Sequence, residues 1–132
     1  MGNWFGLEIA WLVGTNLVLW AWVWLVPPVV IRTRRLLAGA RGMALPGLIL
    51  VRPGEGESTL RHELAHLKQM RRYSPLGTAL LLGWHYGRGF ARHRRVDAPT
   101  LWRLWSQNPL EHEAIQVMHL TTPLPKVWGW KG

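Results

Sequence analysis

The sequence predicts an α+β protein that is mainly α-helical. We expect an N-terminal transmembrane helix followed by a small domain of one short strand or hairpin and three helices. Three observations predict this. An uncharged apolar run opens the chain, later segments carry helix start and stop signals, and Gly47–Arg52 has the pattern of a short strand between turn residues. The 132 residues therefore divide into an anchor helix at 1–31 and a domain at 32–132.

The N-terminal segment has the composition of a membrane helix. From Ile9 to Ile31 there are 23 consecutive residues without a charged side chain, and about 20 helical residues span a bilayer. The predicted helix is Ile9–Val26, because Pro27–Pro28 ends or kinks it. A cleaved signal peptide is one alternative, although the positive start and small-residue cleavage site are missing. A buried core helix is the other, although such helices are rarely apolar on all faces at this length.

Basic residues are confined to the part of the chain after this segment. The chain has 16 Lys and Arg against 7 Asp and Glu, a formal net charge of +9, and Glu8 is the only charged residue before Arg32. Because Arg32, Arg34, Arg35 and Arg41 follow the apolar run, the positive-inside rule predicts a single-pass protein with a cytoplasmic C-terminal domain. We expect membrane lipids as partners of the helix and its basic flank. No specific nucleic acid is expected, because no nucleic-acid-binding motif accompanies the arginines.

The remaining helices and loops are predicted from residues that begin or end helices. Ser58 or Glu57 can cap a helix that ends near Tyr73, before Pro75. The other expectations are a basic connector of at most two helical turns at Arg32–Arg41, a helix at Leu76–Phe90, a loop at Ala91–Pro99, a turn or short helix at Leu101–Trp105, a helix at Asn108–Leu120 and an irregular Thr121–Gly132.

One motif, at His62–His66, indicates a metal site with a catalytic base. Its sequence, His-Glu-Leu-Ala-His, places two imidazoles four residues apart on one helix face, where they can bind one metal ion. Glu63 lies about 100° around the helix, so it can act as a general base without being a ligand. Leu60 and Leu67 lie on or near the opposite face, through which the helix can pack. Because the chain has no cysteine, thiolate zinc sites, disulfides and a cysteine nucleophile are excluded.

A third ligand is expected on the helix that follows Asn108, since catalytic zinc takes three protein ligands. Asn108 and Pro109 fit the N-cap and the first helical position. Glu111 then falls at the third position, where its side chain would turn back to the cap as in a capping box. Glu113 is therefore the preferred ligand, and Glu111 is the alternative.

Other readings of these polar residues stay open. His62 and His66 could be ordinary packed or solvated side chains, and Glu113 could be a surface acid. Tyr86 and His85 are candidate donors to an oxyanion. His119 is a spare candidate ligand.

The motif and its downstream glutamate resemble the gluzincin zinc metallopeptidases. That family has H-E-x-x-H on one helix and a glutamate, often followed by alanine, on a second, here His62–His66 and Glu113-Ala114. The resemblance is greatest to very small gluzincin-like domains with the pattern H-E-L-x-H-x-x-Q, an apolar helix and N-P-x-E-x-E-A, and it covers roughly residues 43–120. It implies a minimal zincin-like domain that binds Zn²⁺ through His62, His66 and Glu113 and uses Glu63 as base. The segment Leu60–His66 also resembles membrane sensor peptidases related to antibiotic-responsive receptors.

The function that follows is a membrane-anchored, zinc-dependent hydrolase, a metallopeptidase whose peptide or protein substrate is unidentified. The alternative is a non-catalytic zinc-containing membrane protein that acts as a binding or adaptor module. It is motivated by the short strand content, since the resembled peptidases usually bind peptide at a larger, strand-rich lobe. A third hypothesis is a basic membrane or nucleic-acid adaptor without metal, whose polyanion binding would depend strongly on salt.

Overall fold

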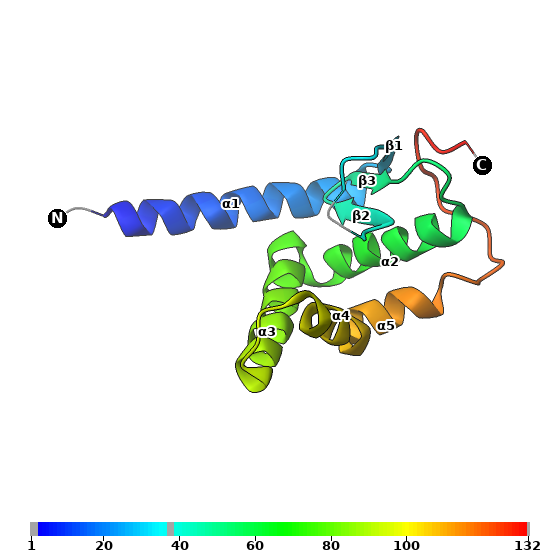
Figure 1. Ribbon diagram of the computed structural model, residues 1–132. Coiled ribbons are helices and arrows are strands. Elements are labelled where there is room, and N and C mark those ends of the chain that lie inside the picture. Colours follow the sequence, from blue (N-terminus) through cyan, green and yellow to red (C-terminus); the bar gives the residue numbers. More distant parts are fainter. Residues whose placement is uncertain (1–2, 37–38, 132) are drawn as a thin grey trace.

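The computed structural model describes residues 3–36 and 39–131. These residues form five helices and one three-stranded sheet (Figure 1), so the chain is mainly helical with a small sheet, as predicted. The helices are α1 (Trp4–Leu25), α2 (Glu57–Tyr73), α3 (Pro75–His93), α4 (Ala98–Gln107) and α5 (Pro109–Gln116), and the strands are β1 (Val29–Arg32), β2 (Gly42–Leu45) and β3 (Leu48–Val51).

Helix α1 projects away from the other elements (Figure 1). It is long and apolar enough to cross a membrane, and Val23 is its one buried residue. Its C-terminal half is held by polar contacts, because the Trp20 indole donates to the carbonyl oxygen of Arg71 at 2.8 Å. The helix begins at Trp4, earlier than the predicted Ile9, and ends at Leu25. Most of its large apolar side chains are exposed, as on a surface that contacts lipid or another molecule.

The sheet is larger than the sequence analysis predicts. Its order is β1-β3-β2, with β1 parallel and β2 antiparallel to β3, which is the predicted strand. The turn between β2 and β3 is Pro46-Gly47, where Gly47 has a φ of +72° that glycine adopts without strain. Strand β1 uses Val29–Ile31, which the sequence analysis assigns to the apolar N-terminal run. These residues form a strand because they pair in parallel with β3, which is remote from them in sequence.

The predicted connector at Arg32–Arg41 is not helical in its described part. Arg32 ends β1, and residues 37 and 38 lie outside the described residues. The connector thus leads from the outer strand β1 to the other outer strand, β2.

The part of the chain after α1 has four helices among the described residues, rather than the predicted three. Helix α4 is the additional one, and the Asp97 side chain caps it by accepting from the backbone N–H of Thr100 at 2.9 Å. Helix α3 continues to His93, which shortens the predicted loop at Ala91–Pro99. Helix α5 ends at Gln116 rather than at Leu120.

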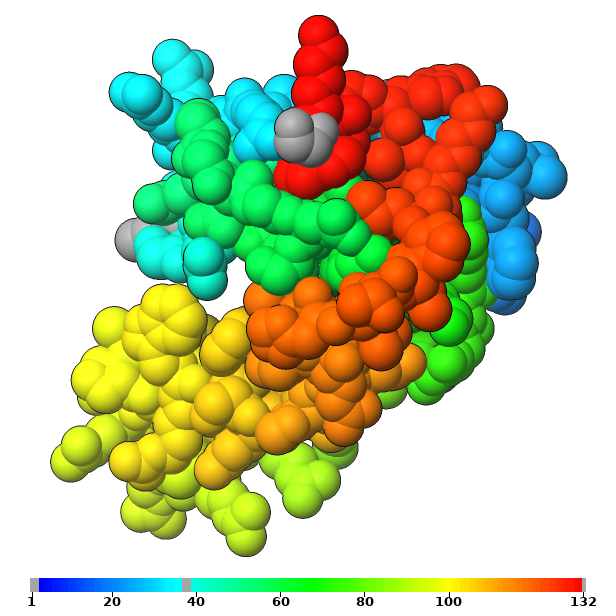
Figure 2. All heavy atoms as spheres, turned by 90° about the vertical axis from the view of Figure 1, so that its right-hand side faces the viewer, coloured from blue at the N-terminus to red at the C-terminus, as the bar shows by residue number. Residues whose placement is uncertain are grey.

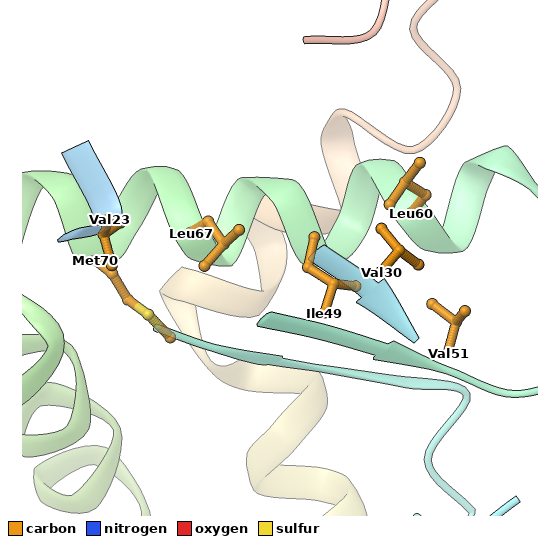
Figure 3. Close-up of a cluster of buried hydrophobic side chains, with 7 residues drawn as sticks. All are labelled: Val23, Val30, Ile49, Val51, Leu60, Leu67 and Met70. Carbon is orange, nitrogen blue, oxygen red and sulfur yellow. The ribbon is translucent and has the colours of Figure 1, made fainter. Parts of the chain in front are cut away.

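Helix α2 lies between the sheet and helix α5. Gly56 is its N-cap, so neither Glu57 nor Ser58 caps it, because both lie inside the helix. Its leucine face packs on the sheet (Figure 3), and its histidines face away from this core toward α5. The prediction that α2 packs through the face that carries Leu60 and Leu67 is confirmed. The buried cluster consists of Val23, Val30, Ile49, Val51, Leu60, Leu67 and Met70.

The segment after α5 is irregular, as predicted, and its backbone forms hydrogen bonds beside the outer strand β1. The backbone N–H of Val30 donates to the carbonyl oxygen of Trp128 at 2.7 Å, and Trp128 donates back to Pro28 at 2.9 Å. The C-terminal segment is thus fixed to β1 beside the end of α1.

Candidate metal centre

Helices α2 and α5 bring three candidate ligands together. His62 and His66 lie one turn apart on α2, and Glu111 lies in the first turn of α5. The Nε2 atoms of the two histidines are 3.2 Å apart. Glu111 Oε2 is 3.0 Å from His62 Nε2, and Glu111 Oε1 is 3.3 Å from His66 Nε2. These three residues could hold a metal ion.

The spacing of these atoms fits a tetrahedral metal. Zinc binds imidazole nitrogen and carboxylate oxygen at about 2.0–2.2 Å, so two of its ligands lie about 3.4 Å apart. The measured separations of 3.0 to 3.3 Å are close to this value. Glu111 Oε2 is also buried without a hydrogen bond of good geometry, which leaves it free to accept a cation.

Gln69 orients one of the histidines. Its side chain is 1% exposed, and its Nε2 donates to the carbonyl oxygen of Leu110 at 2.8 Å. The amide oxygen therefore faces His66 Nδ1, at 2.9 Å, and accepts its proton. A neutral imidazole protonated at Nδ1 carries its lone pair on Nε2, the atom that faces His62 and Glu111. Such partners of a ligating histidine fix its tautomer and ring orientation.

The electrostatics of the cluster favour a positive charge at its centre. Burial alone would raise the pKa of Glu111, but the adjacent imidazoles of His62 and His66 outweigh it and lower that pKa to about 2. Burial alone would lower the pKa of His66, but Glu111 outweighs it, and the pKa of His66 is raised. Both shifts follow from a buried carboxylate that faces two imidazoles, an arrangement that a proton or a metal cation stabilises.

Glu63 lies beside the cluster without belonging to it. It is 5% exposed, and burial raises its pKa above the ordinary value. Strand β2 supports it, because Gly42 leaves room for the carboxylate: a Cβ at residue 42 would lie 2.8 Å from Glu63 Oε1. A buried carboxyl with a raised pKa beside candidate metal ligands has the properties of a general acid–base group.

A cavity of about 560 Å³ opens onto this cluster. His62, Glu63, His66 and Glu111 form its polar end, and residues 39–44 line it from the sheet side. In Figure 2 the segment around β2 in cyan and helix α2 in green lie above, and α4 in yellow and α5 in orange lie below. The rest of the lining is mainly apolar and includes Met43, Met70, Leu82, Trp102, Trp105 and Ile115.

The structure places Glu111, and not the predicted Glu113, beside both histidines. Glu113 faces outward, where its carboxylate lies 3.5 Å from the Arg72 guanidinium and 3.3 Å from Gln69 Nε2. The capping box that assigned Glu111 a structural role does not form. The backbone N–H of Asn108 already donates to Trp105 at the end of α4, so the cap leaves no donor for Glu111.

Of the secondary candidates, Tyr86 alone lines the cavity. Burial and the nearby Glu111 raise the pKa of its hydroxyl, so it remains a protonated donor. His85 instead contacts the carbonyl oxygen of Leu104 at 3.1 Å and lines a different hollow. His119 is exposed and lies beyond the end of α5, outside the cluster.

Comparison of the chain with protein-family models, with curated proteins and with solved structures gives no match.

Proposed function

We propose that this protein is a membrane-anchored zinc hydrolase that cleaves peptide bonds. The observation that carries the proposal is the convergence of two imidazole nitrogens and one carboxylate within 3.0–3.3 Å, beside a separate buried carboxyl group and at the end of a cavity. Three protein ligands with a fourth position left for water is the usual arrangement of catalytic zinc. His62, His66 and Glu111 are the ligands in this proposal.

When bound, zinc acts as a Lewis acid that makes water more acidic and polarises a carbonyl oxygen. Glu63 takes the proton of the attacking water on its carboxylate and returns it to the leaving amine. Its buried position supports this role, because a raised pKa brings the carboxyl closer to the operating pH. Tyr86, which lines the same cavity, is the candidate donor to the oxygen that becomes negative during attack.

The shape of the cavity suggests the kind of substrate. Its polar end carries the proposed chemistry, and most of the remaining lining is apolar, with Trp102 and Trp105 from α4. A peptide with bulky apolar side chains next to the cleaved bond fits this division better than a polar one. Glu63 and the edge strand β2 lie on the same side of the cavity, next to the site of attack.

Helix α1 is proposed to insert into the membrane as the anchor. Its support is its apolar composition and its exposure, since among residues 3–36 and 39–131 Val23 is the one residue of α1 that is buried. The positive-inside rule, applied to Arg32, Arg34 and Arg35 after the helix, then places the hydrolase domain on the cytoplasmic side.

The test of this proposal is hydrolysis of a fluorogenic peptide library by the detergent-purified full chain. The expected result is turnover that a chelator abolishes, that zinc restores and that Glu63→Gln lacks although it retains metal. Turnover that Glu63→Gln shares with the unaltered chain would contradict the assigned role of Glu63.

The small sheet motivates one alternative, a zinc-containing binding or adaptor module without catalysis. Each strand spans only four residues, so little backbone is offered for an extended peptide. This alternative predicts a stoichiometric metal and a fold that depends on it, with no cleavage of any library component under the same conditions.

A further inference from the structure

Helix α3 has an exposed apolar face that no other described element covers. Leu80 is 64% exposed, Leu81 43% and Trp84 70%. With 3.6 residues per turn, these three side chains lie within about 100° of one another around the helix. Scattered exposed apolar side chains are ordinary, whereas a contiguous group on one face marks a surface that meets an apolar partner.

Two arginines continue the same face toward the C-terminal end of α3. Arg88 and Arg92 are exposed, and with Trp84 they line a hollow of about 190 Å³ between α3 and α4. No acidic residue occurs between Pro75 and Val96. Among the ion pairs within residues 3–36 and 39–131, none involves Arg88 or Arg92. Their charges are therefore available to an anion from outside the domain.

The start of α3 is fixed to the middle of α1. Asn16 Nδ2 donates to Ser74 Oγ at 3.1 Å, and Asn16 Oδ1 accepts from the backbone N–H of Leu76 at 2.8 Å. From there α3 runs steeply across the direction of α1 (Figure 1). The part of α1 that projects beyond this contact, Trp4–Thr15, has 12 residues and a length of about 18 Å.

This geometry limits how α1 can enter a bilayer. The hydrocarbon core is about 30 Å thick, and the free part of α1 is shorter than that. Any insertion deeper than about 18 Å therefore brings α3 against the lipid. Because α2 and α4 pack on α3 from the domain side, its uncovered face is turned to the side toward which α1 projects (Figure 1).

We propose that the outer face of α3 is a membrane-contact surface that takes anionic phospholipid. Leu80, Leu81 and Trp84 enter the boundary between headgroups and acyl chains, and Arg88 and Arg92 bind headgroup phosphates. Amphipathic helices that lie flat in this boundary combine such an apolar face with basic residues. The inference rests on the proposed insertion of α1, and it adds a second attachment that fixes the orientation of the metal cavity relative to the bilayer.

The test uses site-specific depth measurement, for which the absence of cysteine leaves a clean background. Spin labels are placed one at a time at Leu12→Cys, Leu81→Cys, Trp84→Cys and Thr121→Cys in the full chain, reconstituted into vesicles with and without phosphatidylglycerol. Leu12 reports the α1 anchor, and Thr121 is an exposed control in the segment after α5. The measured quantity is the accessibility of each label to oxygen relative to a water-soluble nickel complex.

The expected result is a lipid-like ratio at Leu12, Leu81 and Trp84 and a water-like ratio at Thr121. A lipid-like ratio at Leu12 with water-like ratios at Leu81 and Trp84 would overturn the α3 surface and leave the anchor intact. A water-like ratio at Leu12 would refute the anchor and the α3 surface together. Either result is independent of whether the metal site is catalytic.

The arginine contribution is tested in the Leu81→Cys background. Arg88→Gln with Arg92→Gln should reduce the immersed fraction of the label in phosphatidylglycerol vesicles, by about fivefold in the equilibrium per charge removed. The matched control is Lys126→Gln with Lys131→Gln, which removes the same charge from exposed residues of the segment after α5. An equal effect of both pairs would overturn phosphate binding by Arg88 and Arg92.

Discussion

Helices α2 and α3 follow one another directly and depart from the usual burial rule in opposite directions. Helix α2 buries polar residues, with Glu63 5% and Gln69 1% exposed, whereas α3 exposes Leu80 and Trp84 at 64% and 70%. A buried polar group or an exposed apolar patch is more informative than the reverse, because each is unfavourable without a partner. Under the two proposals these departures have different partners, a metal ion between α2 and α5 and lipid against the outer face of α3.

The largest expected effect separates chemistry from metal binding on α2. Glu63→Gln keeps the shape of the side chain but removes its ability to accept a proton. We expect turnover of a cleaved library peptide to fall about 10²- to 10⁴-fold, with zinc content unchanged. Glu113→Gln is the control, because Glu113 faces Arg72 outside the cluster. Loss of zinc together with turnover in Glu63→Gln would show that Glu63 is needed for binding rather than for proton transfer.

A smaller effect is expected when the support of Glu63 is changed from strand β2. In Gly42→Ala the new methyl group would lie 2.8 Å from Glu63 Oε1, so the carboxylate must move. We expect turnover to fall by up to about 100-fold, as small displacements of catalytic groups can do, while zinc stays bound. Gly83→Ala adds a methyl group on α3 that meets no atom within 4 Å apart from its own helix backbone and chain neighbours, and it should be silent in this assay. Equal turnover in both variants would mean that β2 does not position Glu63.

Gln69 provides a test of the metal site that removes no ligand. Gln69→Leu deletes the acceptor that holds the Nδ1 proton of His66, so the imidazole loses its fixed tautomer. We expect zinc affinity, measured by competition with a chromogenic chelator, to fall about 10- to 100-fold. Lys68→Gln, an exposed neighbour on the same helix, should keep the affinity. Unchanged affinity in Gln69→Leu would exclude Gln69 as the orienting residue.

The smallest effect is expected on the other side of the comparison. Leu81→Ser and Trp84→Ser replace exposed apolar side chains that contribute little to the folded core in detergent. The free energy of unfolding should change by no more than about 0.5 kcal/mol, and zinc content should stay constant. Thermal unfolding in detergent with parallel metal analysis checks this. A large loss of stability would show that the face is structural, and would remove the reason to assign it to the membrane.

The local elements of this fold could be predicted from sequence, whereas its pairings could not. Proline and glycine mark the ends of α2, and the period of the leucines shows which face of that helix is buried. Strand β1 is not predicted, because it forms by parallel pairing with β3, which is remote from it in sequence. Helix α4 is predicted only in part, because its N-cap residue, Asp97, lies within the segment that is expected to be a loop.

The position of Glu111, rather than the predicted Glu113, beside the histidines is related to how α4 ends. A capping box at Asn108 requires a free backbone N–H at the cap. That N–H is engaged by Trp105, because Asn108 ends α4 as well as beginning α5. Glu111 is then released toward the histidines, and Glu113, two residues further on, is rotated away by about 200°. The closeness of His62 and His66 could be predicted, because it depends only on the helical repeat.

Metal content per chain decides whether His62, His66 and Glu111 form a zinc site. Elemental analysis would compare the detergent-purified full chain with Glu111→Ala and Glu113→Ala after equilibration with zinc and removal of the free ion. We expect about one zinc per chain in the unaltered protein and in Glu113→Ala, as a three-ligand site would bind, and little or none in Glu111→Ala. No zinc in the unaltered chain, or loss of zinc in Glu113→Ala with retention in Glu111→Ala, would refute His62, His66 and Glu111 as the ligand set.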